Sequence, residues 1–154
     1  MRSVDEHLAT ILAAVRPAAP VRVPLEQSLG LVLAEDLVAR VDLPGFDNSA
    51  MDGYAVRAAD VASARFDDPA TRVTLPVVGE VPAGGVADRA VGPGEAVRIM
   101  TGAMMPQGAD TIVKVEDTDG GTRTVEIHAA APVGRSIRPA GEDVRAGVTV
   151  LHAG

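Results

Sequence analysis

The feature that most constrains the fold is the way glycine, proline and aspartate divide the chain into short runs. The 154 residues include 16 glycines and 11 prolines. The runs between them are rich in β-branched side chains, a composition that favours strands. We expect strands or extended segments at residues 31–41, 73–81, 96–100, 111–115, 122–128 and 148–151. The chain is therefore predicted to be mostly β.

A strong turn signal separates two of these strands. The sequence Asp117-Thr118-Asp119-Gly120-Gly121 lies between residues 111–115 and 122–128. Aspartate and glycine are the residues that tight hairpin turns favour, because they tolerate left-handed backbone conformations. We therefore predict a hairpin in which these two strands pair with each other.

The N-terminal end is predicted to form a helix. Ser3 and Glu6 have the spacing of a capping box, in which each side chain bonds the other residue's backbone N–H. The apolar side chains that follow at helical spacing are Val4, Leu8, Ile11, Leu12 and Val15. Pro17 and Pro20 are expected to end the helix, and residues 25–28 to form one further helical turn. The pattern is typical of an amphipathic packing helix.

The apolar residues set the character of the core. They are mostly Ala, Val and Leu, and the aromatic residues are two Phe and one Tyr. A chain of this length suits one domain or two small ones. We expect an α+β fold, mostly β, in which residues 1–42 and 140–154 form a discontinuous helix and extended arm. Residues 43–139 are expected to form an inserted β-rich unit of short, coiled strands.

Charge and composition exclude several classes of function. The formal net charge of −7 argues against a broad basic surface for nucleic acid. An anionic ligand would need a local basic group, backbone N–H donors or a divalent cation held by carboxylates. The absence of cysteine excludes disulfides and thiolate metal sites. No apolar run of about 18 residues is present, and the acidic N-terminal residues do not suit a signal peptide. We expect no membrane span and a cytoplasmic protein.

The stretch LPGFDNSAMDGYAVRAAD concentrates polar and aromatic residues in one short segment. Asp47, Asn48, Ser49, Asp52 and Tyr54 lie within eight positions. Asp-Gly and Pro-Gly pairs in the same stretch are typical of tight turns. Two such turns would present side-chain oxygens and backbone N–H groups on a fixed loop, which suits a metal or a polar ligand. The alternative is a connector in which the same side chains only cap turns.

A second segment, AVRIMTGAMMPQGADTIVKVED, leads from a predicted strand into Thr101-Gly102. A small hydroxyl followed by glycine at a strand end lets a ligand approach the backbone closely. The neighbouring Met104 and Met105 suit adaptable contacts with a ligand or a partner. The alternative is two strands joined by a turn at residues 106–108, with the methionines in the core.

A third segment, RPAGEDVRAG, places Glu142 and Asp143 between two glycines, with Arg138 and Arg145 on either side. It suits either a bound cation or phosphate, or a solvated turn. Elsewhere the sequence has no dinucleotide or Walker glycine loop, no HExxH motif and no nucleophile elbow. The residues taken alone therefore provide no complete catalytic set.

The three segments in this order resemble the MoeA family of molybdopterin molybdenumtransferases, which includes the gephyrin E domain. The matching motifs are PGFDNSAMDGYAVR, GEAVRIMTGAMMPQGADTIVKVED and GEDVRAG, and the resemblance runs from the first helix to Gly154. It implies a transferase of molybdenum cofactor biosynthesis that acts on adenylylated molybdopterin and molybdate. The adenylate is hydrolysed with a divalent cation, Mg²⁺, and molybdenum is inserted into the dithiolene. The resemblance also implies an elongated homodimer, with a MogA-like adenylyltransferase as a candidate partner.

The resemblance assigns roles to particular residues. Asp52 and Thr101 match the family's active-site aspartate and threonine, and Asp143 matches a further functional acid. Mg²⁺ is expected at Asp52 and Asp143. The motif residues expected to bind substrate are Asp47, Asn48 and Ser49. Residues 43–139 then form a lid over a cleft, whose other wall is a nucleotide- and pterin-binding α/β domain of the second subunit.

The family's α/β domain and its C-terminal β domain have no counterpart in these 154 residues. The resemblance therefore implies an N-terminal half that carries the lid's share of the site and is inactive alone. Two alternatives stay open: a non-catalytic dimerisation or interaction module, and a stand-alone β domain that binds a polar ligand without chemistry. An in-frame α/β domain encoded downstream would favour the enzyme.

Overall fold

The computed structural model describes residues 2–16 and 18–154 and divides the chain into two units. One unit runs up to Leu37 and includes Leu151–Gly154, and the other is Val38–Val150. In the part of the chain that is described, no helix has both the length and the apolar character needed to cross a bilayer.

The first unit begins with helix α1, Val4–Ala14. The predicted capping box is confirmed: the Ser3 N–H donates to Glu6 Oε2 at 2.8 Å, and the Glu6 N–H donates to Ser3 Oγ at 3.2 Å. The helix ends at Val15, whose backbone is extended; Pro17 lies outside the described residues. None of the α1 side chains is buried, so the packing role of this helix stays a prediction.

The remainder of the first unit is short and irregular. The predicted helical turn is present as the 3₁₀ helix η1, Leu25–Gln27. The C-terminal residues of the unit are held by hydrogen bonds to residues near its N-terminal end. The Gly154 N–H donates to the Leu33 carbonyl at 3.1 Å, and the Ala153 N–H donates to Asp36 Oδ1 at 2.9 Å.

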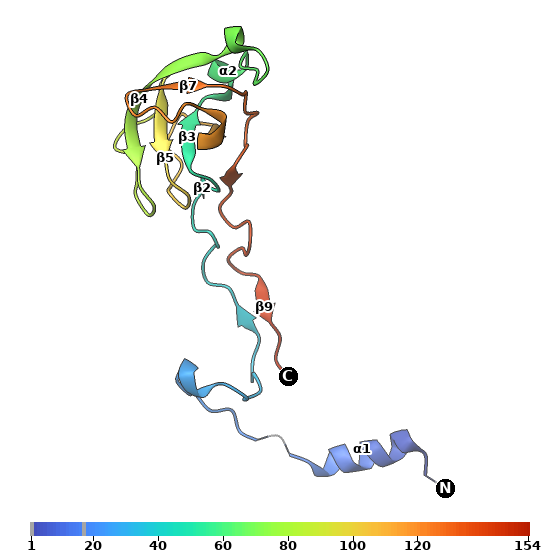
Figure 1. Ribbon diagram of the computed structural model, residues 1–154. Helices are drawn as coiled ribbons and strands as arrows, with labels where there is room; N and C mark the ends of the chain where they lie inside the picture. The colour runs from blue at the N-terminus through green and yellow to red at the C-terminus, as the bar shows by residue number, and fades with distance from the viewer. Residues whose placement is uncertain (1, 17) are drawn as a thin grey trace. The chain divides into compact units, whose positions relative to one another are not determined.

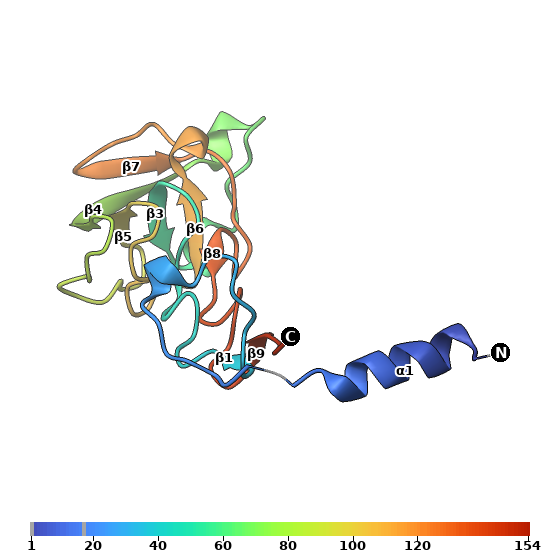
Figure 2. The same ribbon diagram turned by 90° about the horizontal axis from the view of Figure 1, so that it is seen from below.

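The second unit is built on a five-stranded sheet with the order β6-β3-β5-β4-β7 (Figures 1 and 2). Its strands are β3 (Gly53–Val56), β4 (Val73–Val81), β5 (Ala96–Ile99), β6 (Thr111–Lys114) and β7 (Thr124–Ile127). Neighbouring strands are antiparallel except β4 and β5, which are parallel. Short helices lie between the strands: α2 (Ala58–Val61), η2 (Pro69–Thr71) and η3 (Val115–Asp117). The mostly β character predicted from the sequence is confirmed.

The predicted pairing of residues 111–115 with 122–128 is wrong, although the chain does reverse at residues 117–121, where Thr118 forms an antiparallel bridge with Ile127. The two strands, β6 and β7, lie at opposite edges of the sheet, and β7 pairs with β4 instead. The chain does turn at the predicted glycines, and Gly120 has the left-handed φ of 71° that favours this residue. Turn residues indicate that a chain reverses direction, but they do not specify the strand with which it then pairs.

The sheet is covered on both faces by small and β-branched side chains. One cluster contains Tyr54, Val56, Leu75 and Ala96, and the other contains Ala55, Val97 and Ile99 among their buried members. All four residues of β3 are buried, and the strand is paired on both sides, with β6 and with β5. The Tyr54 hydroxyl donates to the Gly121 carbonyl at 2.9 Å, so its one buried polar atom has a partner.

Two separate two-stranded ladders are also present. Strand β2 (Asn48–Ser49) pairs with β8 (Ile137–Arg138), and β1 (Leu37–Val38) pairs with β9 (Thr149–Leu151). Of the predicted extended segment at residues 31–41, only β1 is a regular strand. Strands β2, β3 and β8 were not predicted, because they are short and lie in segments rich in turn residues.

The structure predicts that Gly53→Ala destabilises the fold. A Cβ at this position would overlap the Val113 carbonyl oxygen and lie 2.9 Å from the Cα of Lys114. Since both atoms belong to a neighbouring strand backbone, the strands must separate, and we expect a loss of about 1–3 kcal/mol in the free energy of unfolding. Urea unfolding measures it. Gly45→Ala is the control, because its Cβ would meet only the Asp42 carbonyl oxygen at 3.9 Å; equal unfolding midpoints for the two variants would contradict the expectation.

Candidate functional site

The three segments singled out in the sequence lie side by side in the second unit. Strand β2 of the first segment is hydrogen-bonded on one side to β8 of the third, with Asn48 opposite Arg138. On its other side it meets the second segment. The Ser49 N–H donates to the Ala103 carbonyl at 3.0 Å, and the Gly102 N–H donates to the Ser49 carbonyl at 2.8 Å. Backbone hydrogen bonds therefore join residues about 50 and 90 positions apart into one surface region.

The two predicted catalytic residues, Asp52 and Thr101, are hydrogen-bonded to each other. Asp52 immediately precedes β3, and Thr101 follows β5 after one residue. Because β3 and β5 are antiparallel, with Gly53 opposite Ile99, these strand ends meet. Asp52 Oδ1 accepts from both the backbone N–H and the hydroxyl of Thr101, each at 2.7 Å. The sheet register thus fixes one oxygen of an exposed carboxylate.

These two hydrogen bonds lower the pKa of Asp52 below its ordinary value. The backbone N–H of Thr101 contributes most, and the Thr101 hydroxyl contributes next. The positive charge of Arg98 adds to the shift, while partial desolvation opposes it. Among the described residues, no hydrogen bond reaches the other oxygen, Oδ2. The site therefore presents an ionised carboxylate with one oxygen held and one available to a ligand.

The residues expected to bind substrate are mostly engaged in holding the loop. Asp47 Oδ1 accepts the Ala140 N–H at 2.7 Å. The buried Asn48 donates its side-chain amide to the Phe46 carbonyl at 3.1 Å. The buried Ser49 hydroxyl donates to the Met51 carbonyl and accepts the Met51 N–H. In this arrangement their polar atoms position the stretch that leads to Asp52, so the turn-capping alternative describes them well. Their role in substrate binding stays a prediction.

Asp143 lies in an ion-pair cluster of its own segment. Arg138 donates to both carboxylate oxygens of Asp143 at 2.7 Å and to Glu142 Oε2 at 2.9 Å. These contacts raise the pKa of Arg138 above its ordinary value, with the Asp143 hydrogen bonds contributing most. Since Arg138 also sits in β8 opposite Asn48, the cluster is attached to the loop that carries Asp52.

The carboxylates of this region are the candidate ligands for the expected Mg²⁺. In the described part of the chain, no group of three or more His, Cys, Asp or Glu side chains is placed to hold a metal ion. Protein sites often hold Mg²⁺ through one or two carboxylates, with water and substrate phosphates completing the octahedron. Asp52 fits that role through Oδ2. Arg138 donates to both oxygens of Asp143, and each oxygen keeps a further lone pair, so the expected role of Asp143 at a metal stays a prediction.

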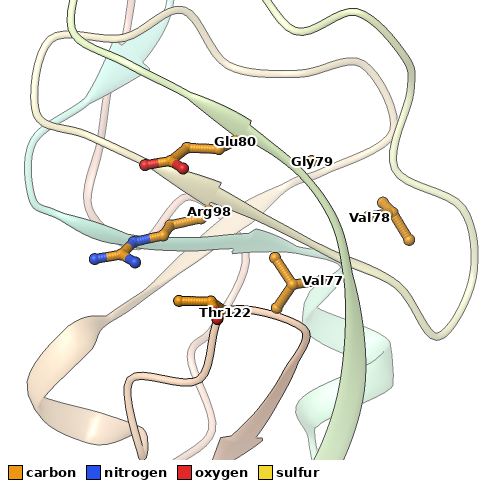
Figure 3. Close-up of a pocket in the computed structure, with 6 residues that line it drawn as sticks. All are labelled: Val77, Val78, Gly79, Glu80, Arg98 and Thr122. Carbon is orange, nitrogen blue, oxygen red and sulfur yellow. The ribbon is translucent and has the colours of Figure 1, made fainter.

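Arg98 is a further candidate residue that none of the sequence motifs singled out. It lies in β5, three residues before Thr101, and is half-buried. It lines a cavity of about 320 Å³ together with Glu80 and Thr122 (Figure 3). The signal that was available is a single charged residue within the otherwise apolar run AVRIM, at a position where a strand has a buried face.

Comparison with known proteins finds relatives that all belong to one family. A family model described as the MoeA N-terminal region (domain I and II) matches residues 2–154. Molybdopterin molybdenumtransferase 2 of Mycobacterium tuberculosis is 52% identical over 154 residues, which are 100% of this chain and 37% of that protein. The molybdopterin molybdenumtransferase of Synechococcus elongatus is 47% identical over 139 residues, which are 90% of this chain and 34% of that protein. The chain thus spans little more than a third of the length of these curated relatives.

A solved structure shows the same fold. The crystal structure of the molybdopterin biosynthesis MoeA protein from Pyrococcus horikoshii OT3 superimposes with a TM-score of 0.80 and 39% sequence identity. The match covers 86% of this chain and 34% of that chain. The mostly β architecture described above is therefore a MoeA-like fold.

The geometry of the carboxylate predicts that Thr101→Val raises the pKa of Asp52 toward its ordinary value. The substitution removes the hydroxyl donor and keeps the backbone N–H, so part of the shift remains. A depressed folded-state pKa stabilises the protein above the ordinary carboxyl pKa, and this contribution is lost as the pH falls through the folded-state value. The advantage of the parent chain over Thr101→Val should accordingly shrink on acidification.

Side-chain ¹³C NMR titration of the Asp52 carboxyl, together with urea unfolding at several pH values, measures this effect. Thr124→Val is the matched control, because Thr124 is exposed on β7 and its hydroxyl is not among the hydrogen bonds described. An Asp52 pKa that is the same in Thr101→Val and in the control would show that the hydroxyl does not act on the carboxylate.

Proposed function

The chain belongs to the MoeA family, and on that premise we propose that it supplies one wall of the active site of a molybdopterin molybdenumtransferase. The proposed reaction takes adenylylated molybdopterin and molybdate, hydrolyses the adenylate and inserts molybdenum into the dithiolene. The observation that carries the proposal is the Asp52–Thr101 pair: an exposed, ionised carboxylate with one oxygen fixed by two hydrogen bonds and the other open.

The fixed oxygen orients the Asp52 carboxylate for a role in such a site. Two donors from one residue restrict the orientation of the carboxylate before substrate arrives, which avoids the cost of ordering it later. The open Oδ2 is then available to hold a divalent cation or to orient a water molecule near the phosphate. A Mg²⁺ ion held there would offset phosphate charge, and this would reconcile an anionic substrate with a chain of net charge −7.

The surrounding segments support Asp52 in this proposal. Asp47, Asn48 and Ser49 hold the loop through backbone contacts. The ion pair of Arg138 with Asp143 fixes the third segment beside that loop. In this view Asp143 acts through Arg138 as a positioning residue. A direct role for Asp143 at a metal would use the lone pairs that Arg138 leaves free.

The rest of the site is proposed to come from outside these residues. The second wall would be a nucleotide- and pterin-binding α/β domain, contributed across a homodimer. The proposal also includes a cytoplasmic location and a MogA-like adenylyltransferase that supplies the adenylylated substrate. Its support is the family membership and the share of the relatives' length that the chain spans.

A second candidate is a non-catalytic dimerisation or interaction module. It is favoured by the apolar residues of α1, several of which are more than half exposed: Val4 by 83%, Leu8 by 51% and Leu12 by 60%. An apolar helix face of this kind suits a protein partner. The two candidates differ in what they require of Asp52, which is essential only for chemistry.

Asp52→Asn in a complete transferase that carries this chain should reduce molybdenum insertion by about 100-fold, the effect typical of removing one preorganised electrostatic group. The amide keeps the size of the side chain but removes its charge. Thr101→Val should reduce the rate less, since the backbone N–H still orients the carboxylate. A reconstituted assay of cofactor formation measures both.

Asp67→Asn is the control for the loss of one negative charge, because Asp67 is exposed and makes none of the hydrogen bonds described. Thermal unfolding of all three variants separates lost activity from lost folding. If Asp52→Asn forms cofactor as fast as the parent enzyme, the carboxylate has no catalytic role and the interaction module becomes the better reading.

The 154-residue chain by itself should fold and be catalytically silent. It carries only one wall of the proposed cleft, so nothing positions the phosphate against Asp52. The measurement is turnover of adenylylated molybdopterin with Mg²⁺ and molybdate present, with circular dichroism to confirm folding. Turnover by the isolated chain would mean that the whole active site lies within these residues.

A further inference from the structure

Arg98 is a half-buried cation whose donors have no described partner. Its register position on β5 places it opposite Tyr54 of β3 and Glu80 of β4. The strand alternation puts its side chain on the face of Tyr54, whereas Val97 and Ile99 pack against the other cluster. Its guanidinium makes no hydrogen bond or ion pair among the contacts of the described residues. Its five N–H donors are therefore available to a ligand.

Glu80 is the natural companion of this guanidinium. It lies directly across the parallel ladder from Arg98, and the two side chains extend in the same direction from neighbouring strands (Figure 3). Within the described chain they form no salt bridge with each other. An acidic acceptor and a set of basic donors thus lie on neighbouring strands, and neither makes a side-chain hydrogen bond or ion pair with the described residues.

The two side chains line a cavity of about 320 Å³, whose other lining residues are Val77, Val78, Gly79 and Thr122. Val77 pairs with Ala96 and Glu80 pairs with Arg98, so β4 contains one residue more than β5 over this stretch. This bulge turns the local backbone at the cavity. The volume lies at the lower end of the range typical of small-molecule pockets, which suits one flat ring system.

The charges in the cavity discriminate between kinds of ligand. A phosphate would be attracted by Arg98 but repelled by Glu80 on the neighbouring strand. A zwitterionic pair of side chains is satisfied by a neutral group that offers N–H donors and a carbonyl acceptor next to each other. The 2-amino-4-oxopyrimidine edge of a pterin has this pattern, because its 2-amino group and N3–H can donate while its O4 can accept.

We propose that this cavity recognises the pyrimidine edge of the pterin, with Glu80 accepting from the 2-amino group and N3–H, and Arg98 donating to O4. The choice of a pterin rests on the proposed function. The site lies beside the one already described, since Arg98 and Thr101 are three residues apart on the same strand end and Arg98 acts on the charge of Asp52. The lid would then contact the pyrimidine edge of a pterin that the proposed α/β domain also binds, and the phosphate end of the substrate would reach Asp52.

The test is an NMR titration of the ¹⁵N-labelled 154-residue chain with pterin, and in parallel with lumazine, which carries an oxygen in place of the 2-amino group. We expect pterin to shift the backbone amides of Glu80, Arg98 and Thr122, and to bind more tightly than lumazine. Glu80→Gln and Arg98→Gln should each weaken pterin binding by about tenfold or more, the effect of losing a charged hydrogen-bond partner. Glu80→Gln should also remove most of the preference for pterin.

Arg89→Gln is the matched control. It makes the same change of charge at an arginine that is ion-paired with Glu95 outside the cavity, and pterin binding should be unchanged. Circular dichroism confirms that every variant folds. Three results would overturn the proposal: pterin shifts that avoid the cavity, equal affinities for pterin and lumazine, or inorganic phosphate that displaces pterin from the cavity.

The outcome is separable from that of the proposed function. Binding is measured without turnover, and Asp52→Asn should leave it intact because Asp52 does not line the cavity. An inactive Asp52→Asn enzyme together with a chain that fails to bind pterin would refute this inference alone. Pterin binding with full activity of Asp52→Asn would refute only the role of Asp52.

Discussion

Strand β3 is the constraint on which the rest of the second unit depends. It is hydrogen-bonded on both sides and buried on both faces, and Gly53 has no space for a side chain against the backbone of β6. A strand so restricted cannot shift its register without breaking two ladders at once. Asp52 immediately precedes this strand, so its position beside Thr101 follows from the pairing of β3 with β5.

The same sheet explains why the candidate site residues gather at one end of the unit. Asp52 precedes β3, Thr101 follows β5, and Arg98 and Glu80 occupy neighbouring strands. Residues distant in sequence are thereby presented at strand ends, where loops replace the ladder and side chains reach solvent. The rigid core supports a surface that is polar and open, which is the arrangement expected of one wall of a larger site.

Electrostatic balance in this region is local. Arg138 is neutralised within its own segment by Glu142 and Asp143, whereas Asp52 keeps its charge through hydrogen bonds to a neutral residue. The ion pairs of Arg138 neutralise charge and hold a loop in place. The hydrogen bonds of Asp52 leave its negative charge available for a ligand. This difference motivates the proposal that Asp143 is a positioning acid and Asp52 a catalytic acid, although both belong to motifs that the family resemblance treats together.

The sequence by itself determined the features that depend on neighbouring residues. The capping box at Ser3, the bounds of β4 and the turn at Gly120 follow from local chemistry, and the three long motifs were sufficient to identify the family. Only the tertiary structure decided that β7 pairs with β4, that Arg138 engages Asp143, and that Arg98 faces Glu80. Strand pairing and ion pairing depend on which distant segments meet, and local spacing does not encode that choice. Asp52 depends on both sequence and tertiary structure: its motif identified it as a candidate site residue, and the register of β3 and β5 decided that Thr101 donates to it.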